Sequence, residues 1–486
     1  MRLHRLVFWA LLGVVALAPL PLGANRPLGW NLMAILVGLL LALWALAMLA
    51  DRRRLSIAGR RSLPMALLFL GVLLWLALQS LAPVPEALQA PDWAAAERAL
   101  GRPLQGALGL QPDRAIDGLV RLGTYGGVFW LALYLGRRPA RARAVLWCVV
   151  ISTAAYATYG LLAYLDGNHA MGLYEKYVYR DSLTATFVNR NSFAAYAALG
   201  LVVAAALAQE RLAGGLARGA GRRVALLRLL DGLDGGFWIC LYGLVVCGGA
   251  LLLSTSRGGA LAALAGLLVV GLARRGAQVG RADEGRRGGG LLFAGLIWGG
   301  AAVLLLGAGD LLIGRLEGVA SAGNHRLLVL DLGARALAER PLTGFGLGSF
   351  PDVFLRYRDD AFGLGLGSMR KAHNSYLELA IEAGIPAALL LLTALGLATW
   401  RCLAGLFERR QNVVFPIAAL SATAVVAVHS LLDFSLQIPA ITVTWCLLLG
   451  VGMAQSWRPR RSAPVTQAAA GESGTPTSAG HRTGRT

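Results

Sequence analysis

Residues 28–50 read LGWNLMAILVGLLLALWALAMLA, a run of 23 residues without a charged side chain. A helix needs about 20 apolar residues to cross the hydrocarbon core of a bilayer. Eleven other apolar runs are found at about 6–22, 63–82, 115–136, 143–165, 191–209, 237–254, 258–273, 290–309, 377–400, 412–431 and 438–457. The sequence therefore predicts an all-α, polytopic transmembrane helical bundle of about twelve spans.

The composition supports this class of protein. Of the 486 residues, 56% are hydrophobic and 15% are charged, whereas soluble domains carry about 25% charged residues. A soluble globular protein and a disordered protein are both excluded. The five cysteines lie in or beside apolar runs at spacings that fit no metal site or disulfide framework. We expect no metal and no other cofactor.

The formal charge of +20 follows the apolar runs. Arginines gather in short connectors between the runs, as the positive-inside rule describes, so we expect no nucleic-acid partner. Connectors on that side, with both termini, hold 29 Lys and Arg against 8 Asp and Glu, and the other side holds 17 against 18. Both termini are therefore predicted to be cytoplasmic.

Three long connectors, 83–114, 166–190 and 310–376, fall on the opposite side. Loops of this length are usually functional or disordered. The connector 310–376 contains helical stretches, such as 327–339, and we expect it to fold as a helical cap. The tail 458–486 is rich in Pro, Ser, Thr, Gly and Arg and is expected to be disordered.

The polar residues of interest lie on the side of these long connectors, and the first group is TATFVNRNS at 184–192. Asn189 and Arg190 stand at a predicted helix start, where backbone amides and a guanidinium together bind anions well. The structural alternative is that Asn191 or Ser192 caps the helix while Arg190 reaches the interface.

A second group is STSRGG at 254–259, where the connector is so short that Arg257 must lie at the membrane mouth. An arginine fork suits a phosphate ligand, although a turn with an interfacial arginine fits equally. Arg326 is a further candidate in the outer loop. The glycine-rich TGFGLGS at 343–349 is either a backbone nest for an oxyanion or a tight turn.

The third group is HNSYLELAIEAG at 373–384. His373 is a candidate general base towards a hydroxyl. Glu378 is a second catalytic candidate, but Ser375 and Glu378 also form a capping-box pattern, which is a purely structural account. Glu382 shares a helix face with Glu378.

A fourth group is His429 and Asp433, one helical turn apart near the end of a span. They form either a His–carboxylate pair that orients substrate or a structural pair.

Taken in order, these motifs resemble those of the O-antigen ligase and polymerase family of bacterial membrane glycosyltransferases. The resemblance covers about 184–434 and rests on TFVNRN at 186–191, LSTSRGG at 253–259, PLTGFGLGSF at 341–350, HNSYLE at 373–378 and HSLLDF at 429–434. It implies an enzyme of the inner membrane whose site faces the periplasm. We accordingly expect N-terminal spans over 1–183, a ligase-like core over 184–434 that includes the loop 310–376, and a last span over 435–457.

The resemblance also implies the reaction. Such enzymes move a glycan from undecaprenyl diphosphate to an acceptor hydroxyl on a lipid A core, another glycan or a protein. By analogy Arg190, Arg257, Arg326 and Asn189 would hold the diphosphate, while His373 or Glu378 would activate the hydroxyl, with support from Glu382, His429 and Asp433. The alternative is a transporter or flippase for a lipid-linked or anionic solute, although no internal repeat is visible and the polar groups favour one face.

Overall fold

A computed structural model of the chain describes residues 2–52, 57–167, 170–171, 174–176, 178–215, 233–279, 319–358, 369–409 and 411–457. The long helices are α1 (Arg2–Leu17), α2 (Pro27–Ala50), α4 (Leu63–Leu81), α6 (Pro112–Leu135), α7 (Pro139–Leu165), α8 (Arg190–Gly215), α10 (Gly235–Leu253), α11 (Arg257–Val279), α14 (Val319–Glu339), α17 (Ile385–Glu408), α18 (Val414–Ser430) and α19 (Pro439–Ala454). Shorter elements are η1 (Leu22–Ala24), α3 (Ile57–Arg61), η2 (Glu86–Leu88), α5 (Pro91–Leu100), α15 (Phe350–Tyr357), α16 (Ser375–Ala383) and η5 (Ser435–Gln437), with a strand pair β1 (Ala170–Met171) and β2 (Tyr174–Glu175).

The all-α, polytopic character is confirmed. Within the described residues, 8 helices are long and apolar enough to cross a membrane, and α18 and α19 are shorter apolar helices. The predicted total of about twelve spans stays a prediction. The predicted run at 290–309 and the predicted tail at 458–486 lie outside the described residues.

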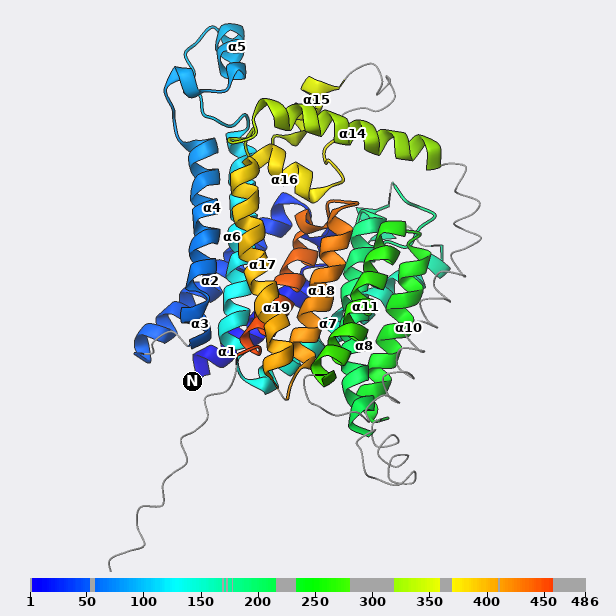
Figure 1. The fold of residues 1–486 in the computed structure, drawn as a ribbon. Helices are drawn as coiled ribbons and strands as arrows, with labels where there is room; N and C mark the ends of the chain where they lie inside the picture. The colour runs from blue at the N-terminus through cyan, green and yellow to red at the C-terminus, as the bar shows by residue number, and fades with distance from the viewer. Residues whose placement is uncertain are drawn as a thin grey trace, which may run out of the picture.

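The membrane helices form one bundle whose centre is α8 (Figure 1). Helix α8 is almost wholly buried because α7, α10, α11 and α18 all contact it. Glycines allow the closest of these approaches. A Cβ on Gly266 of α11 would lie 2.6 Å from Val425 on α18 and 2.7 Å from Val202 on α8. Small residues at such crossings let dispersion contacts hold helices together in lipid.

The predicted span 377–400 is wrong in its start. The chain forms the short helix α16 first, breaks at Gly384, and begins the membrane helix α17 at Ile385. Gly384 has φ +81, which favours glycine, and a Cβ there would lie 2.2 Å from Leu342 O. Pro386 then occupies the first turn of α17, where it costs no hydrogen bond. Glu378 and Glu382 therefore lie outside the membrane helix.

Helices α5, α14, α15 and α16 lie over one end of the bundle (Figure 1). The layer that α14, α15 and α16 form has its own apolar core of Val329, Leu332, Ala336, Phe345, Phe350, Val353, Phe354, Ala372 and Ile381. The described parts of the connector 310–376 thus fold as a helical cap. That the cap faces the periplasm stays a prediction.

Candidate active site

His373 and Asp433 form a hydrogen-bonded pair at the capped end of the bundle. His373 precedes α16, Asp433 follows α18, and His373 Nδ1 lies 3.2 Å from Asp433 Oδ1. The ring of Phe434 packs edge-on against the imidazole at 5.1 Å between centroids. The Asp433 side chain is 3% exposed and that of His373 is 33% exposed. The imidazole is therefore held from the protein side and remains open to a substrate on the other.

The charge state of Asp433 follows from its neighbours. Burial opposes its ionisation, but the hydrogen bond and charge of His373, the charge of His429 and the backbone amide of Phe434 together hold its pKa below the usual range. An ionised Asp433 accepts a hydrogen bond from Nδ1–H of His373. Nε2 is then the basic nitrogen of the neutral imidazole, which suits a general base.

The sequence predicted His429 and Asp433 as a pair, and the structure distributes them differently. The Asp433 carboxylate is hydrogen-bonded to His373, 60 residues away in the chain, and to the amide of Phe434. His429 is fully buried, and its Nδ1 lies 2.7 Å from Ser435 Oγ. A Cβ on Gly258 would lie 3.8 Å from His429 Nε2, so His429 packs against the start of α11. His429 thus contacts Ser435 and the start of α11, and its supporting role in the site stays a prediction.

Arg190, the first residue of α8, is held by hydroxyl groups. Its Nη1 donates to Thr255 Oγ1 at 2.8 Å and to Ser182 Oγ at 3.3 Å. The amide of Leu183 donates to Leu253 O at 3.0 Å, which joins the connector to the end of α10. The structure therefore brings together the two motifs at 184–192 and 254–259, which the sequence places about 65 residues apart.

Asn189 and Arg257 occupy the starts of two helices. Asn189 Oδ1 accepts a hydrogen bond from Asn191 N at 2.7 Å, so this oxygen closes the first turn of α8. Arg257 is the exposed first residue of α11. Ser256 Oγ accepts from Gly259 N at 3.1 Å and caps α11. Arg326 lies on α14, and its side chain is outside the described residues.

Tyr179, which sequence reasoning missed, lies against Arg190. Its ring centroid lies 5.2 Å from the guanidinium carbon of Arg190. Burial raises the pKa of the Tyr179 hydroxyl, the charge of Arg190 opposes that rise, and the charge of Asp433 adds to it. Tyr179 is therefore near both Arg190 and Asp433. Its place in a polar connector without periodicity gave no signal by which to find it.

Both carboxylate oxygens of Glu378 accept hydrogen bonds from within the protein. Its side chain is 2% exposed, Oε1 accepts from Lys371 Nζ at 3.2 Å, and Oε2 accepts from Ala372 N at 2.9 Å. The predicted capping box is wrong, because the N-cap of α16 is Asn374, which accepts from the amides of Tyr376 and Leu377. Glu378 instead anchors the segment that leads into His373.

Glu382 fills the turn made by the glycine-rich run. Its Oε1 accepts from Phe350 N at 3.2 Å, at the start of α15. Gly344, Gly346 and Gly348 have φ values of 66°, 100° and 80°, which favour glycine. The amides of Gly344 and Gly346 donate to Arg340 O and Glu382 O, so the run is the tight turn that the sequence offered as the alternative to an anion nest.

The pKa of Glu382 is raised above its ordinary value. Burial and the negative charge of Glu378 raise its pKa to about 7, while Lys371 and the backbone amides of Gly348 and Phe350 oppose the rise. Two buried carboxylates this close do not both ionise easily. The hydrogen bonds of Glu378 and Glu382 therefore join α16 to the segment before it and to the start of α15.

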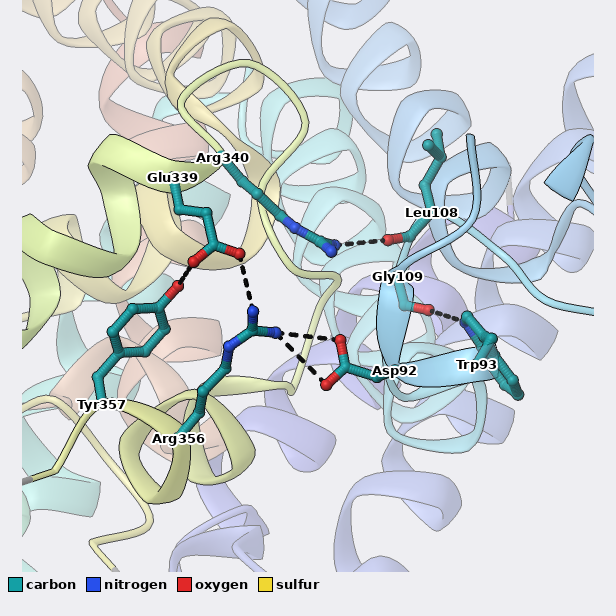
Figure 2. A network of polar contacts seen from close by, with 8 residues as sticks. All are labelled: Asp92, Trp93, Leu108, Gly109, Glu339, Arg340, Arg356 and Tyr357. Atoms are coloured by element: carbon teal, nitrogen blue, oxygen red, sulfur yellow. Dashed lines mark hydrogen bonds and ion pairs between the residues drawn. The ribbon is translucent and has the colours of Figure 1, made fainter. Parts of the chain in front are cut away.

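A second network joins α5 and its flanking connector to the cap (Figure 2). Arg356 lies 3.1 Å from Asp92 and 3.0 Å from Glu339, and Tyr357 donates to Glu339. Arg340 donates to Leu108 O at 3.3 Å. Arg356 thus makes two ion pairs that tie α5 to the cap.

Fold and site together define a multi-pass membrane protein whose bundle carries a His–Asp pair and Arg190 at one capped end. The model of the O-antigen ligase family matches residues 242–392. This match supports the resemblance to the O-antigen ligase family found in the sequence. It includes Arg257, His373, Glu378 and Glu382, while Arg190, His429 and Asp433 lie outside it. None of the curated proteins matches the chain.

Proposed function

We propose that the protein is a glycosyltransferase that moves a glycan from undecaprenyl diphosphate to an acceptor hydroxyl at the periplasmic face of the bacterial inner membrane. The observation that carries the proposal is the pairing of partly exposed His373 with buried Asp433, at the end of the membrane bundle where Arg190 also lies. The match of residues 242–392 to O-antigen ligases supports it. The acceptor is the core sugar of lipid A for a ligase, or another lipid-linked glycan for a polymerase.

The site suits a displacement at the anomeric carbon. The acceptor oxygen attacks that carbon while His373 Nε2 takes the hydroxyl proton, and Asp433 stabilises the resulting imidazolium. The bond from the anomeric carbon to the diphosphate oxygen breaks, and its electron pair leaves with the diphosphate. Arg190 and Arg257 neutralise the charge that develops there. A diphosphate leaving group is already activated, so the proposal requires no metal.

A complementation experiment tests the proposal. The gene is deleted and restored as wild type, His373→Ala, Asp433→Asn or Arg190→Ala at matched protein levels, and the envelope polysaccharide is profiled. Arg335→Ala is the control, because that exposed pair with Asp331 lies on the cap helix α14. Wild type and the control are expected to restore long glycan and the three site variants to fail.

The pattern of loss identifies the branch of the family. Single repeat units left on the acceptor indicate a polymerase, and full chains that accumulate on the lipid carrier indicate a ligase. A profile restored by all three site variants contradicts the proposal and favours a transporter. Retention of activity in EDTA checks the metal-free reaction.

A further inference from the structure

Several non-glycine residues at the capped end have a left-handed backbone, Tyr179, Thr255 and His373 among them. Tyr179, Thr255 and His373 have φ values of 55°, 53° and 51°. Side chains rarely adopt this region because it costs free energy, and residues held there cluster at functional sites. Thr255 and His373 both belong to the site already described. Tyr179 shares this backbone conformation, and nothing above assigns it a role.

The contacts of Tyr179 are those of a residue within the site. One side of its ring meets the guanidinium of Arg190 at 5.2 Å. Tyr179 is also 38% exposed, so part of the side chain is available to a ligand. Arg190 is in turn fixed by Thr255 Oγ1 and Ser182 Oγ. The arrangement therefore holds an aromatic side chain in place next to a cation.

The chemistry of the transfer specifies what must lie beside Tyr179. The anomeric carbon of the donor is bonded to the diphosphate on one side and is attacked by the acceptor oxygen on the other. With the diphosphate on Arg190 and the attacking oxygen on His373, the first sugar occupies the space between these residues. Tyr179 adjoins Arg190 and lies in the field of Asp433, the partner of His373.

Resting on the proposed function, we propose that Tyr179 contacts the first sugar of the lipid-linked donor while its ring orients Arg190 towards the diphosphate. An aromatic ring offers the sugar an apolar face, and it attracts the guanidinium on its other side. A leucine keeps apolar bulk but offers neither the π-face nor the hydroxyl. Tyr179 is thus a residue that recognises the sugar as well as the diphosphate.

Binding of two probes by the purified full-length protein in nanodiscs tests this inference without turnover. One probe is a polyprenyl diphosphate without sugar, and the other is the same lipid bearing a single N-acetylhexosamine. Wild type is expected to bind the sugar-bearing probe about tenfold more tightly, because that ratio corresponds to a single good ring contact. Tyr179→Leu is expected to bind both probes equally, and Tyr179→Phe to keep most of the preference.

Two further variants show whether a change in binding is specific to Tyr179. Arg190→Ala is expected to weaken binding of both probes, because it removes the cation that meets the diphosphate. Tyr242→Leu is a matched control, since Tyr242 is an exposed tyrosine on α10 whose hydroxyl lies 2.6 Å from Thr158 Oγ1. It is expected to behave as wild type. Thermal unfolding of each variant establishes that it is folded.

The outcomes separate the two proposals. If Tyr179→Leu keeps the preference for the sugar-bearing probe, the contact with the sugar is disproved and the proposed function stands. Equal binding of both probes by wild type disproves it as well. If wild type binds neither probe, the proposed function fails and the inference fails with it.

Discussion

Helix α16 adjoins two clusters of ionisable side chains, and the two clusters differ in exposure and in hydrogen bonding. At the N-terminal end, His373 pairs with Asp433, and the imidazole is one-third exposed. Within the helix, Glu378 and Glu382 are buried, and their oxygens accept hydrogen bonds from Lys371 and the backbone. A carboxylate whose oxygens are all used can hold a loop, whereas a histidine with one side open can act on a substrate. We therefore propose a chemical role for the first cluster and a structural role for the second.

The largest expected effect is on transfer by the first cluster. His373→Ala is expected to lower the kcat of the folded fraction by about 10²–10⁴-fold, the usual contribution of a general base, and to lower thermal stability because buried Asp433 loses its side-chain partner. Asp433→Asn is expected to lower kcat as well, because an amide does not stabilise the imidazolium. Glycan transfer by purified protein, with unfolding followed in parallel, measures both.

Glu378→Gln is expected to lower stability and leave kcat nearly unchanged, whereas the changes in the first cluster are expected to lower kcat. The change removes a charge that Lys371 Nζ and Ala372 N both meet, so it is expected to cost about 1–3 kcal/mol of stability. The folded fraction should keep a kcat within a few-fold of wild type. Thermal unfolding and transfer assays on the same preparation measure the two effects. A stable but inactive Glu378→Gln protein would return Glu378 to the catalytic candidates.

Glu382 gives the second cluster a pH signature. Its pKa in the folded protein is raised to about 7 from an ordinary value of 4.5, so between these values the folded state holds a proton that the unfolded state has lost. This contribution to stability is full below about pH 4.5 and is lost as pH rises to about 7. Lys371, Glu378 and the amides of Gly348 and Phe350 are the groups acting on it.

Glu382→Gln removes that titration. Relative to wild type, the variant is therefore expected to gain stability as pH rises from 5 to 8, and unfolding temperatures at several pH values measure the difference. Glu378→Gln serves as the comparison, because losing the Glu378 charge should lower the pKa of Glu382 and shift the window to lower pH. A difference between Glu382→Gln and wild type that stays constant over this range would show that Glu382 does not titrate there.

The sequence was informative where the physics is local. Uncharged runs such as 28–50 predict membrane helices because length and hydropathy alone decide insertion. The break at Gly384 was missed because it interrupts an otherwise apolar run. His373 and Asp433 were each chosen as candidates, but their pairing depends on how α16 packs against the end of α18, which no local pattern encodes. Tyr179 was missed for the same reason.

The Ser375 hydroxyl gives the smallest test of the comparison. It donates to Asp433 O at 3.0 Å and so ties the start of α16 to the loop that carries Asp433. Ser375→Ala removes one hydrogen bond and is expected to cost about 1 kcal/mol of stability, with the N-cap unaffected because Asn374 supplies it. If the first cluster depends on precise placement, kcat should fall a few-fold while the KM for donor stays constant.

Asn374→Ala is the control, because it weakens the same helix by about 1 kcal/mol without touching Asp433. An equal loss of kcat in both variants would mean that helix stability, and not the position of Asp433, sets the rate.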